Sequence, residues 1–171
     1  MLRLAFTMIL AVVALNCTAS AAEKSFDIIG ASGSSIGGAG LTSGPHGTLI
    51  TISISKNGLR PGWHGIHIHQ IGDCSDVGKF KNSKGHVNPG SSKHGLLNPD
   101  GPHPADLPNI YAQSDGSVHA ELFAPGVFLG GSAGNLLDAD GSAIVIHANP
   151  DDHMAQPIGG AGPRVACVVI K

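Results

Sequence analysis

The sequence has 171 residues, of which 25 are glycine and 11 are proline, whereas 13% are charged and 4% are aromatic. This composition excludes a coiled coil or a bundle of long helices and favours short elements joined by turns. The formal net charge is −2, so the chain lacks the basic balance of a nucleic-acid-binding protein, and an anionic membrane is not a natural partner either. Ten histidines are the unusual feature. Because histidine is the commonest metal ligand, they indicate metal binding.

The first 22 residues are predicted to be a secretory signal peptide that is cleaved. A short basic start precedes an apolar run over residues 4–15, which is too short to span a bilayer. Small residues at 19–22 then supply a signal-peptidase site. A helix that stays attached as an anchor is one alternative. A lipid on Cys17 is another, although Asn16 fits poorly before a lipidated cysteine.

Cleavage would leave two cysteines, Cys74 and Cys167, together with nine basic and twelve acidic residues. An even pair of cysteines in an exported protein predicts one disulfide. The bond would close a loop of about ninety residues and contribute about 4–5 kcal/mol through the entropy of the unfolded chain. Two unrelated buried thiols are the alternative.

Period-two alternation predicts the strands. Within residues 48–54, isoleucine occupies positions 50, 52 and 54 and alternates with Thr51 and Ser53, which is typical of a half-buried strand. Residues 118–122 alternate in the same way after an Asp-Gly turn signal. Apolar strands are also expected at 143–147 and 165–170. Because no stretch of the mature chain shows a sustained helical period, we expect an all-β fold, an antiparallel sandwich or barrel.

Two histidines flank an isoleucine in the segment Gly65–His69. On a strand His67 and His69 point to the same face, where they could offer two nitrogens to one metal ion, or be ordinary histidines of a polar face. His147 ends the strand at 143–147 and could add a third nitrogen, or be structural. By the same parity His64 points away from His67, and we expect it at the surface.

A long segment without strand alternation, residues 72–107, is rich in Gly, Pro, Ser, Asn and Lys. Long loops inside compact domains are usually functional or disordered. Three imidazoles and one carboxylate in this loop make a complete tetrahedral set for zinc with no vacant position, as structural sites require. A solvated polar loop is the alternative. The four residues are His86, His94, His103 and Asp106.

With these motifs the chain resembles the copper,zinc superoxide dismutases. The resemblance covers nearly the whole mature chain and implies a Greek-key β-barrel of about eight antiparallel strands with a long metal-binding loop. It also implies a catalytic domain over residues 46–171, with residues 23–45 as a partly flexible lead-in to the first strand. The segments that carry it are 65–69, 72–74, 85–89, 93–95, 101–109, 147–151 and 162–167.

The resemblance implies one copper and one zinc in each subunit, with His86 bridging the two ions. An imidazole gives up both ring protons when two cations hold its two nitrogens. Four nitrogens in a tetragonal arrangement suit Cu(II), and three nitrogens with a carboxylate suit zinc. The expected copper ligands are His67, His69, His86 and His147, and the expected zinc ligands are His86, His94, His103 and Asp106.

Further roles follow from the same resemblance. Asp151 is expected to accept hydrogen bonds from His67 and His94 and so to orient one histidine of each site. Arg164 is expected beside the copper, where its guanidinium would hold the anionic substrate. Read alone, Asp151 could be a plain loop acid and Arg164 a surface residue. Cys167 would pair with Cys74.

The implied activity is the dismutation of superoxide to dioxygen and hydrogen peroxide, with copper cycling between redox states, His86 carrying a proton and zinc structural. Lysines of the long loop would add a positive field that attracts the anion. They are Lys79, Lys81, Lys84 and Lys93.

Two other interpretations also include bound metal but assign the protein a different function. A non-catalytic periplasmic copper- or zinc-binding protein should lack a copper histidine or the arginine, and a zinc hydrolase needs a vacant metal position with a carboxylate base beside it. The expected location is a bacterial periplasm. Superoxide is the expected partner, without nucleic acid or, in the mature form, membrane, and a homodimer is a further expectation.

Overall fold

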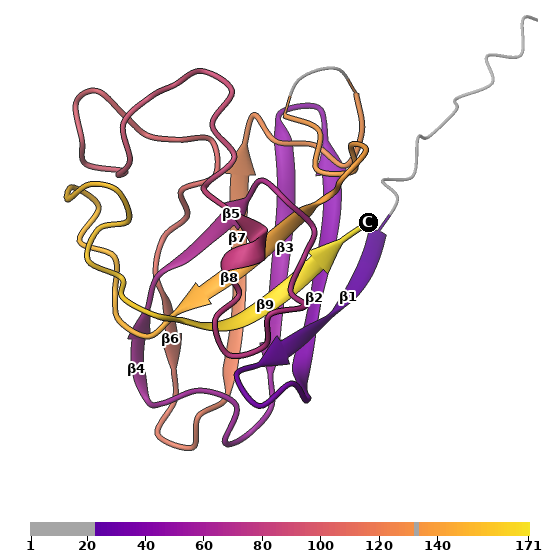
Figure 1. The fold of residues 1–171 in the computed structure, drawn as a ribbon, viewed down its shortest axis with the longest axis vertical. Coiled ribbons are helices and arrows are strands. Elements are labelled where there is room, and N and C mark those ends of the chain that lie inside the picture. Colours follow the sequence, from indigo (N-terminus) through magenta and orange to yellow (C-terminus); the bar gives the residue numbers. More distant parts are fainter. Residues whose placement is uncertain (1–22, 132–133) are drawn as a thin grey trace, which may run out of the picture.

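The computed structural model describes residues 23–131 and 134–171 (Figure 1). The predicted signal peptide therefore lies outside the described residues. Among the described helices, none is both long enough and apolar enough to cross a membrane. The elements are β1 (Glu23–Gly30), β2 (Ser35–Gly44), β3 (Gly47–Ile54), β4 (Gly62–His64), β5 (Ile66–His69), the 3₁₀ turn η1 (Lys81–Ser83), β6 (Ile110–Ala112), β7 (Val118–Pro125), β8 (Ser142–His147) and β9 (Arg164–Ile170).

Seven of these strands form one antiparallel sheet in the order β5-β8-β9-β1-β2-β3-β7, and β4 pairs with β6. The sheet curls back on itself, so that β8 and β9 cross in front of β3 and β2 in Figure 1. The sheet bends between β9 and β1. Two residue pairs join these strands, Ile29 with Cys167 and Gly30 with Ala166. The all-β prediction is confirmed, and the strands predicted at 48–54, 118–122, 143–147 and 165–170 correspond to β3, β7, β8 and β9.

The core lies between the two parts of the curled sheet. In β3 the side chains of Ile50, Ile52 and Ile54 are buried, whereas Thr51 and Ser53 are exposed, as the alternation predicts. Burying an isoleucine side chain contributes about 1.5–3 kcal/mol. Every residue of β5 and of β8 is buried, because one face of these strands meets the core and the other lies beneath loops.

Residues 23–45 form β1 and β2, so the interpretation of this segment as a lead-in to the first strand was wrong. The alternation is hidden because β2 contains Gly37, Gly38 and Gly40. Gly37 packs so closely on β3 that a Cβ atom there would overlap the carbonyl oxygen of Ser53. Close approach of two backbones requires glycine, and it removes the side chains from which a strand is recognised in sequence.

The predicted long loop is present between β5 and β6. We call residues 70–109 the metal loop, and within this fully described range η1 is the single helical turn. A disulfide joins Cys74 in the metal loop to Cys167 in β9 across 93 residues, which confirms the predicted bond. A second segment, residues 148–163 between β8 and β9, is called the C-terminal loop.

Candidate metal centre

The metal loop returns to the free edge of β5. Isolated β-bridges pair His69 with His86 and His67 with Asp106. An edge strand leaves a row of unpaired backbone groups, and these bridges use part of that row. They also bring the side chains of the loop beside the two histidines of the strand.

Four buried ring nitrogens have no hydrogen-bond partner among the described residues, and they come from histidines whose rings pack against one another. Leaving one buried polar atom unsatisfied costs about 1–3 kcal/mol, so four of them in one group of rings indicate a site that binds a cation. The centroid of the His67 ring lies 4.3 Å from that of the His86 ring and 4.9 Å from that of the His147 ring. We call this group the four-nitrogen cluster: His67 Nδ1, His69 Nε2, His86 Nε2 and His147 Nε2.

The opposite nitrogens of three of these rings are held by acceptors, which fixes their tautomers. His67 Nε2 donates to Asp151 Oδ2 at 2.7 Å. His69 Nδ1 donates to the Lys84 carbonyl at 2.7 Å, and His147 Nδ1 donates to the Gly162 carbonyl at 3.0 Å. Each ring therefore turns a lone pair, and not a hydrogen, toward the centre of the cluster, as metal-ligating histidines do.

A second group, the carboxylate cluster, brings together Nδ1 of three histidines and Oδ1 of Asp106. The carboxylate oxygen lies 3.1 Å from His86 Nδ1, 2.9 Å from His94 Nδ1 and 3.3 Å from His103 Nδ1. Zinc bonds of about 2.0–2.1 Å would separate the corners of a tetrahedron by about 3.3–3.4 Å. The four atoms thus fit a tetrahedral zinc ion after a small expansion. His86 offers Nδ1 to this cluster, and its ring packs against those of His67 and His69, with centroids 4.3 and 5.0 Å away, so that its unpartnered Nε2 joins the four-nitrogen cluster.

Asp151 connects the two clusters from behind. Its carboxylate accepts from His67 Nε2 at 2.7 Å and from His94 Nε2 at 3.1 Å. Burial would raise the pKa of this carboxyl, but the bonds from the two histidines hold it well below its usual range. The carboxylate is therefore charged at neutral pH and orients one ring of each cluster.

Without a bound ion, His94 of the carboxylate cluster differs in charge from His67 and His147 of the four-nitrogen cluster. Burial lowers the pKa of His67 to about 4 and that of His147 to about 3. Burial also acts to lower the pKa of His94, but its hydrogen bonds to Asp106 and Asp151 outweigh that and raise it to about 9. His67 and His147 are hence neutral at pH 7, so a cation that enters the four-nitrogen cluster does not have to displace protons from these two rings.

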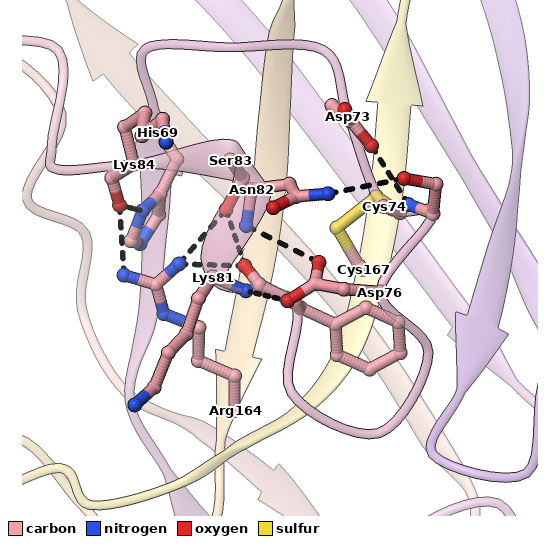
Figure 2. The surroundings of a disulfide bond; sticks show 12 residues. His69, Asp73, Cys74, Asp76, Lys81, Asn82, Ser83, Lys84, Arg164 and Cys167 are labelled. Carbon is pink, nitrogen blue, oxygen red and sulfur yellow. Dashed lines mark hydrogen bonds between the residues drawn. A yellow bond between two sulfur atoms is a disulfide. The ribbon is translucent and has the colours of Figure 1, made fainter.

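Arg164 is fixed at the mouth of the site by three acceptors (Figure 2). Its Nη1 donates to the Phe80 carbonyl at 2.6 Å and to Ser83 Oγ at 3.0 Å, and its Nη2 donates to the Lys84 carbonyl at 2.7 Å. A cavity of about 660 Å³ opens beside the guanidinium and reaches His147. Three of the four predicted lysines line this cavity, which makes it a positively charged approach to the four-nitrogen cluster: Lys79, Lys81 and Lys84.

His64 is buried, so its predicted surface position was wrong. It is 2% exposed, and its ring lies between the carbonyl oxygens of Arg60 at 2.7 Å and His147 at 2.6 Å. The alternation of side chains along a strand predicts which face His64 lies on, but it does not predict whether other residues cover that face. Here residues 60 and 147 cover it, and the histidine joins the end of β8 to the turn before β4. Of the other unassigned histidines, His46 and His119 are exposed.

Sequence reasoning missed the polar residues that shape the metal loop. Asp76 accepts the backbone N–H groups of Lys81 and Asn82 at 2.8 and 3.2 Å, and Ser83 Oγ donates to the Phe80 carbonyl at 2.8 Å (Figure 2). These bonds set the carbonyls that hold the arginine. The available signal was the density of Asp, Ser and Asn, which favours turns without saying which turn.

Comparison with known proteins gives the family. The family model described as copper/zinc superoxide dismutase (SODC) matches residues 36–170. The chain belongs to the copper/zinc superoxide dismutase family. The match begins inside β2, which agrees with a domain that includes this strand.

Individual relatives agree with the family. A Cu-Zn superoxide dismutase of Caulobacter vibrioides is 52% identical over 142 residues, which cover 81% of this chain and 80% of the relative. One from Aquifex aeolicus is 44% identical over 147 residues, covering 85% of each chain.

Solved structures give the same result for the fold. A superoxide dismutase-like protein from Bacillus subtilis has a TM-score of 0.81 at 37% identity, covering 86% of this chain and 97% of that chain. The Cu/Zn superoxide dismutase from Brucella abortus has a TM-score of 0.67 at 27% identity, covering 88% and 100%. The activity of this dismutase is the dismutation of superoxide, and its family implies copper and zinc as cofactors.

Proposed function

We propose that this dismutase binds one copper ion in the four-nitrogen cluster and one zinc ion in the carboxylate cluster, with His86 between them. The observation that carries this assignment is the set of four buried nitrogens without protein partners beside a tetrahedral group that shares one of the rings. Nitrogen ligands suit copper, and the carboxylate with three imidazoles suits zinc. Bound copper supplies one-electron chemistry to the reaction.

The protein groups supply the protons and the binding of the anion. Two superoxide ions and two protons give one dioxygen and one hydrogen peroxide, while one electron passes from the first superoxide to the second. His86 Nε2 is the proposed carrier of one proton, because Nδ1 of the same ring stays engaged in the carboxylate cluster. Water is the proposed source of the other. Arg164 is proposed to hold the superoxide, since it lies at the cavity that reaches His147.

His147→Ala is the variant that tests this function. The copper- and zinc-loaded wild-type protein is expected to inhibit superoxide-driven dye reduction, and the variant to lose at least about 100-fold of that activity, because changes one shell further from a metal already cost about 10–100-fold. Metal analysis should find near-normal zinc, and electron paramagnetic resonance should show altered copper coordination.

The matched control is His119→Ala, which removes an exposed histidine of β7. Its activity and copper spectrum should match those of the wild type. Full activity in His147→Ala would overturn the copper assignment. Copper binding without any dismutation by the wild type would favour the non-catalytic role.

The lysines of the cavity are expected to act through their field. Changing Lys79 and Lys81 together to glutamine should lower the rate by about twofold to tenfold at low salt and flatten its dependence on ionic strength, because steering of an anion is screened by salt. Pulse radiolysis at several salt concentrations measures this. The same change at Lys24 of β1 is the control, and an ionic-strength profile like the wild type's in the double variant would contradict the proposal.

Export and assembly complete the proposal. The Cys74–Cys167 disulfide supports an oxidising compartment, here a bacterial periplasm. An exposed aromatic pair supports a homodimer: Trp63 is 55% and Tyr111 45% exposed, and their rings pack edge to face at 5.0 Å. Cell fractionation and analytical ultracentrifugation test these two points.

A further inference from the structure

The metal loop and the C-terminal loop are joined by side-chain amides at the metal centre. Gln156 of the C-terminal loop meets His94 of the metal loop through both backbone groups. Its Oε1 accepts the His94 N–H at 3.0 Å, and its Nε2 donates to the His94 carbonyl at 2.8 Å. One side chain thus contacts both backbone groups of a histidine in the carboxylate cluster, and Asn98 Nδ2 donates a second hydrogen bond to the same carbonyl at 3.0 Å.

Asn109 makes the reciprocal contact from the metal loop. Its Oδ1 accepts the Asp151 N–H at 2.8 Å, and its Nδ2 donates to the Asp151 carbonyl at 2.9 Å. The same Nδ2 lies 3.2 Å from His153 Nε2. Because a backbone N–H donates and a carbonyl accepts, each amide can lie in one orientation only, so both contacts are specific in direction.

The two contacts hold the two residues that meet between the clusters. His94 Nε2 donates to Asp151 at 3.1 Å, and Asp151 also accepts from His67. Both held residues are buried and lie outside regular strands, so the amides replace a sheet ladder as the source of backbone hydrogen bonds. Removing Gln156 would leave the His94 N–H without its partner, and removing Asn109 would do the same to the backbone N–H of Asp151, at the point where the two loops touch.

The loops also approach closely beside this pair. Leu97 N donates to the His153 carbonyl at 3.1 Å. Gly95 has a φ of +114°, and a Cβ there would overlap the backbone of His153. No side chain fits between the loops at this point, so the relative position of their backbones is set by these contacts.

We propose that Gln156 and Asn109 are positioning residues that act as a crossed pair of clamps, fixing His94 against Asp151 and thereby slowing release of zinc. The inference rests on the proposed placement of zinc in the carboxylate cluster. Neither residue touches the ion or the substrate. Their effect passes through the backbone of His94 and the carboxylate that orients its ring, an arrangement in which outer residues change metal affinity by about 10–100-fold.

Gln156→Ala tests the clamp in the fully metallated, disulfide-intact protein. Transfer of zinc to an excess of a chromogenic chelator is expected to be about tenfold faster than in the wild type. Gln156→Glu keeps the acceptor for the His94 N–H and loses the donor to its carbonyl, so its rate should fall between the two. The matched control, Gln113→Ala, changes an exposed glutamine after β6 and should release zinc at the wild-type rate.

Cobalt in place of zinc provides a spectroscopic readout. The wild type should give the intense visible bands of tetrahedral cobalt, and Gln156→Ala should show shifted bands, whereas Gln113→Ala should not. Wild-type release rates and bands in both Gln156 variants would overturn the clamp while leaving the ligand assignment intact. Should Gln156→Ala fail to fold by circular dichroism, Gln156→Glu and Asn109→Asp carry the same decision.

His94→Ala separates this inference from the function on which it rests. Loss of zinc from that variant supports the carboxylate cluster as the zinc site, and the clamp is then judged on the Gln156 variants alone. Retention of zinc with unchanged release in His94→Ala would overturn the site assignment, and the clamp with it.

Discussion

Replacing Cys74 and Cys167 together with serine is expected to lower the free energy of unfolding of the metal-free dismutase by about 4–5 kcal/mol. The bond closes a loop of 93 residues, and without it the unfolded chain gains conformational freedom that the folded state lacks. Urea unfolding followed by circular dichroism measures the difference. This is a large fraction of the total stability of an ordinary domain, which is about 5–15 kcal/mol.

The same variant should also lose activity when it is loaded with metals. Cys74 anchors the segment whose backbone carbonyls at Phe80 and Lys84 hold Arg164 (Figure 2). Freed from β9, this segment would hold the guanidinium less firmly beside the cavity. Reductant should bring the wild type to the stability of the variant and leave the variant unchanged. A variant that unfolds at the same urea concentration as the oxidised wild type would contradict this role.

Acid is expected to destabilise the metal-free protein strongly between pH 6.5 and pH 4. His67 and His147 have folded pKa values of about 4 and about 3, lowered by burial, whereas in the unfolded chain they titrate near 6.5. In this window the unfolded state binds more protons than the folded state, so the free energy of unfolding falls as pH falls. Each of these two histidines contributes a slope of about 1.4 kcal/mol per pH unit.

The alkaline side has the opposite sign for one histidine. The pKa of His94 is raised to about 9, so the stability it contributes is present below pH 6.5 and is lost as pH rises to 9. Urea unfolding of the metal-free, disulfide-bonded protein at pH 4.5, 5.5, 6.5, 7.5 and 8.5 should therefore show a maximum near pH 6.5. His67→Gln should reduce the slope on the acid side, and His119→Gln should leave the curve unchanged. A flat curve would refute this account.

The fold was predictable where one face of a strand packs on the core and the other meets water. β3 and β7 alternate strictly; β3 was predicted at nearly its observed bounds, and β7 over its first five residues. β2 was missed because glycines replace the side chains that would reveal it. Burial of β5 and β8 on both faces depends on loops distant in sequence, which local alternation does not describe.

The candidate metal ligands could be predicted from the sequence, but the residues that hold them in place could not. The spacing of His67 and His69 on a strand placed two nitrogens on one face, and the loop residues stood out because histidine and aspartate carry recognisable metal chemistry. Asn109 and Gln156 are residue types that do not indicate a metal site. Each holds a backbone 42 or 62 residues away, and a loop amide looks the same in sequence whether it binds water or a buried peptide group.

The carbonyl oxygen of Lys84 accepts from His69 and from Arg164, both at 2.7 Å. The residue adopts a φ of +62°, an unfavourable conformation for a lysine that the surrounding contacts maintain. Rotation of this one peptide group would tilt an imidazole of the four-nitrogen cluster and shift the guanidinium at the entrance together. A substitution that moves this one peptide group is therefore expected to change the orientation of the His69 ring and the position of the Arg164 guanidinium at the same time.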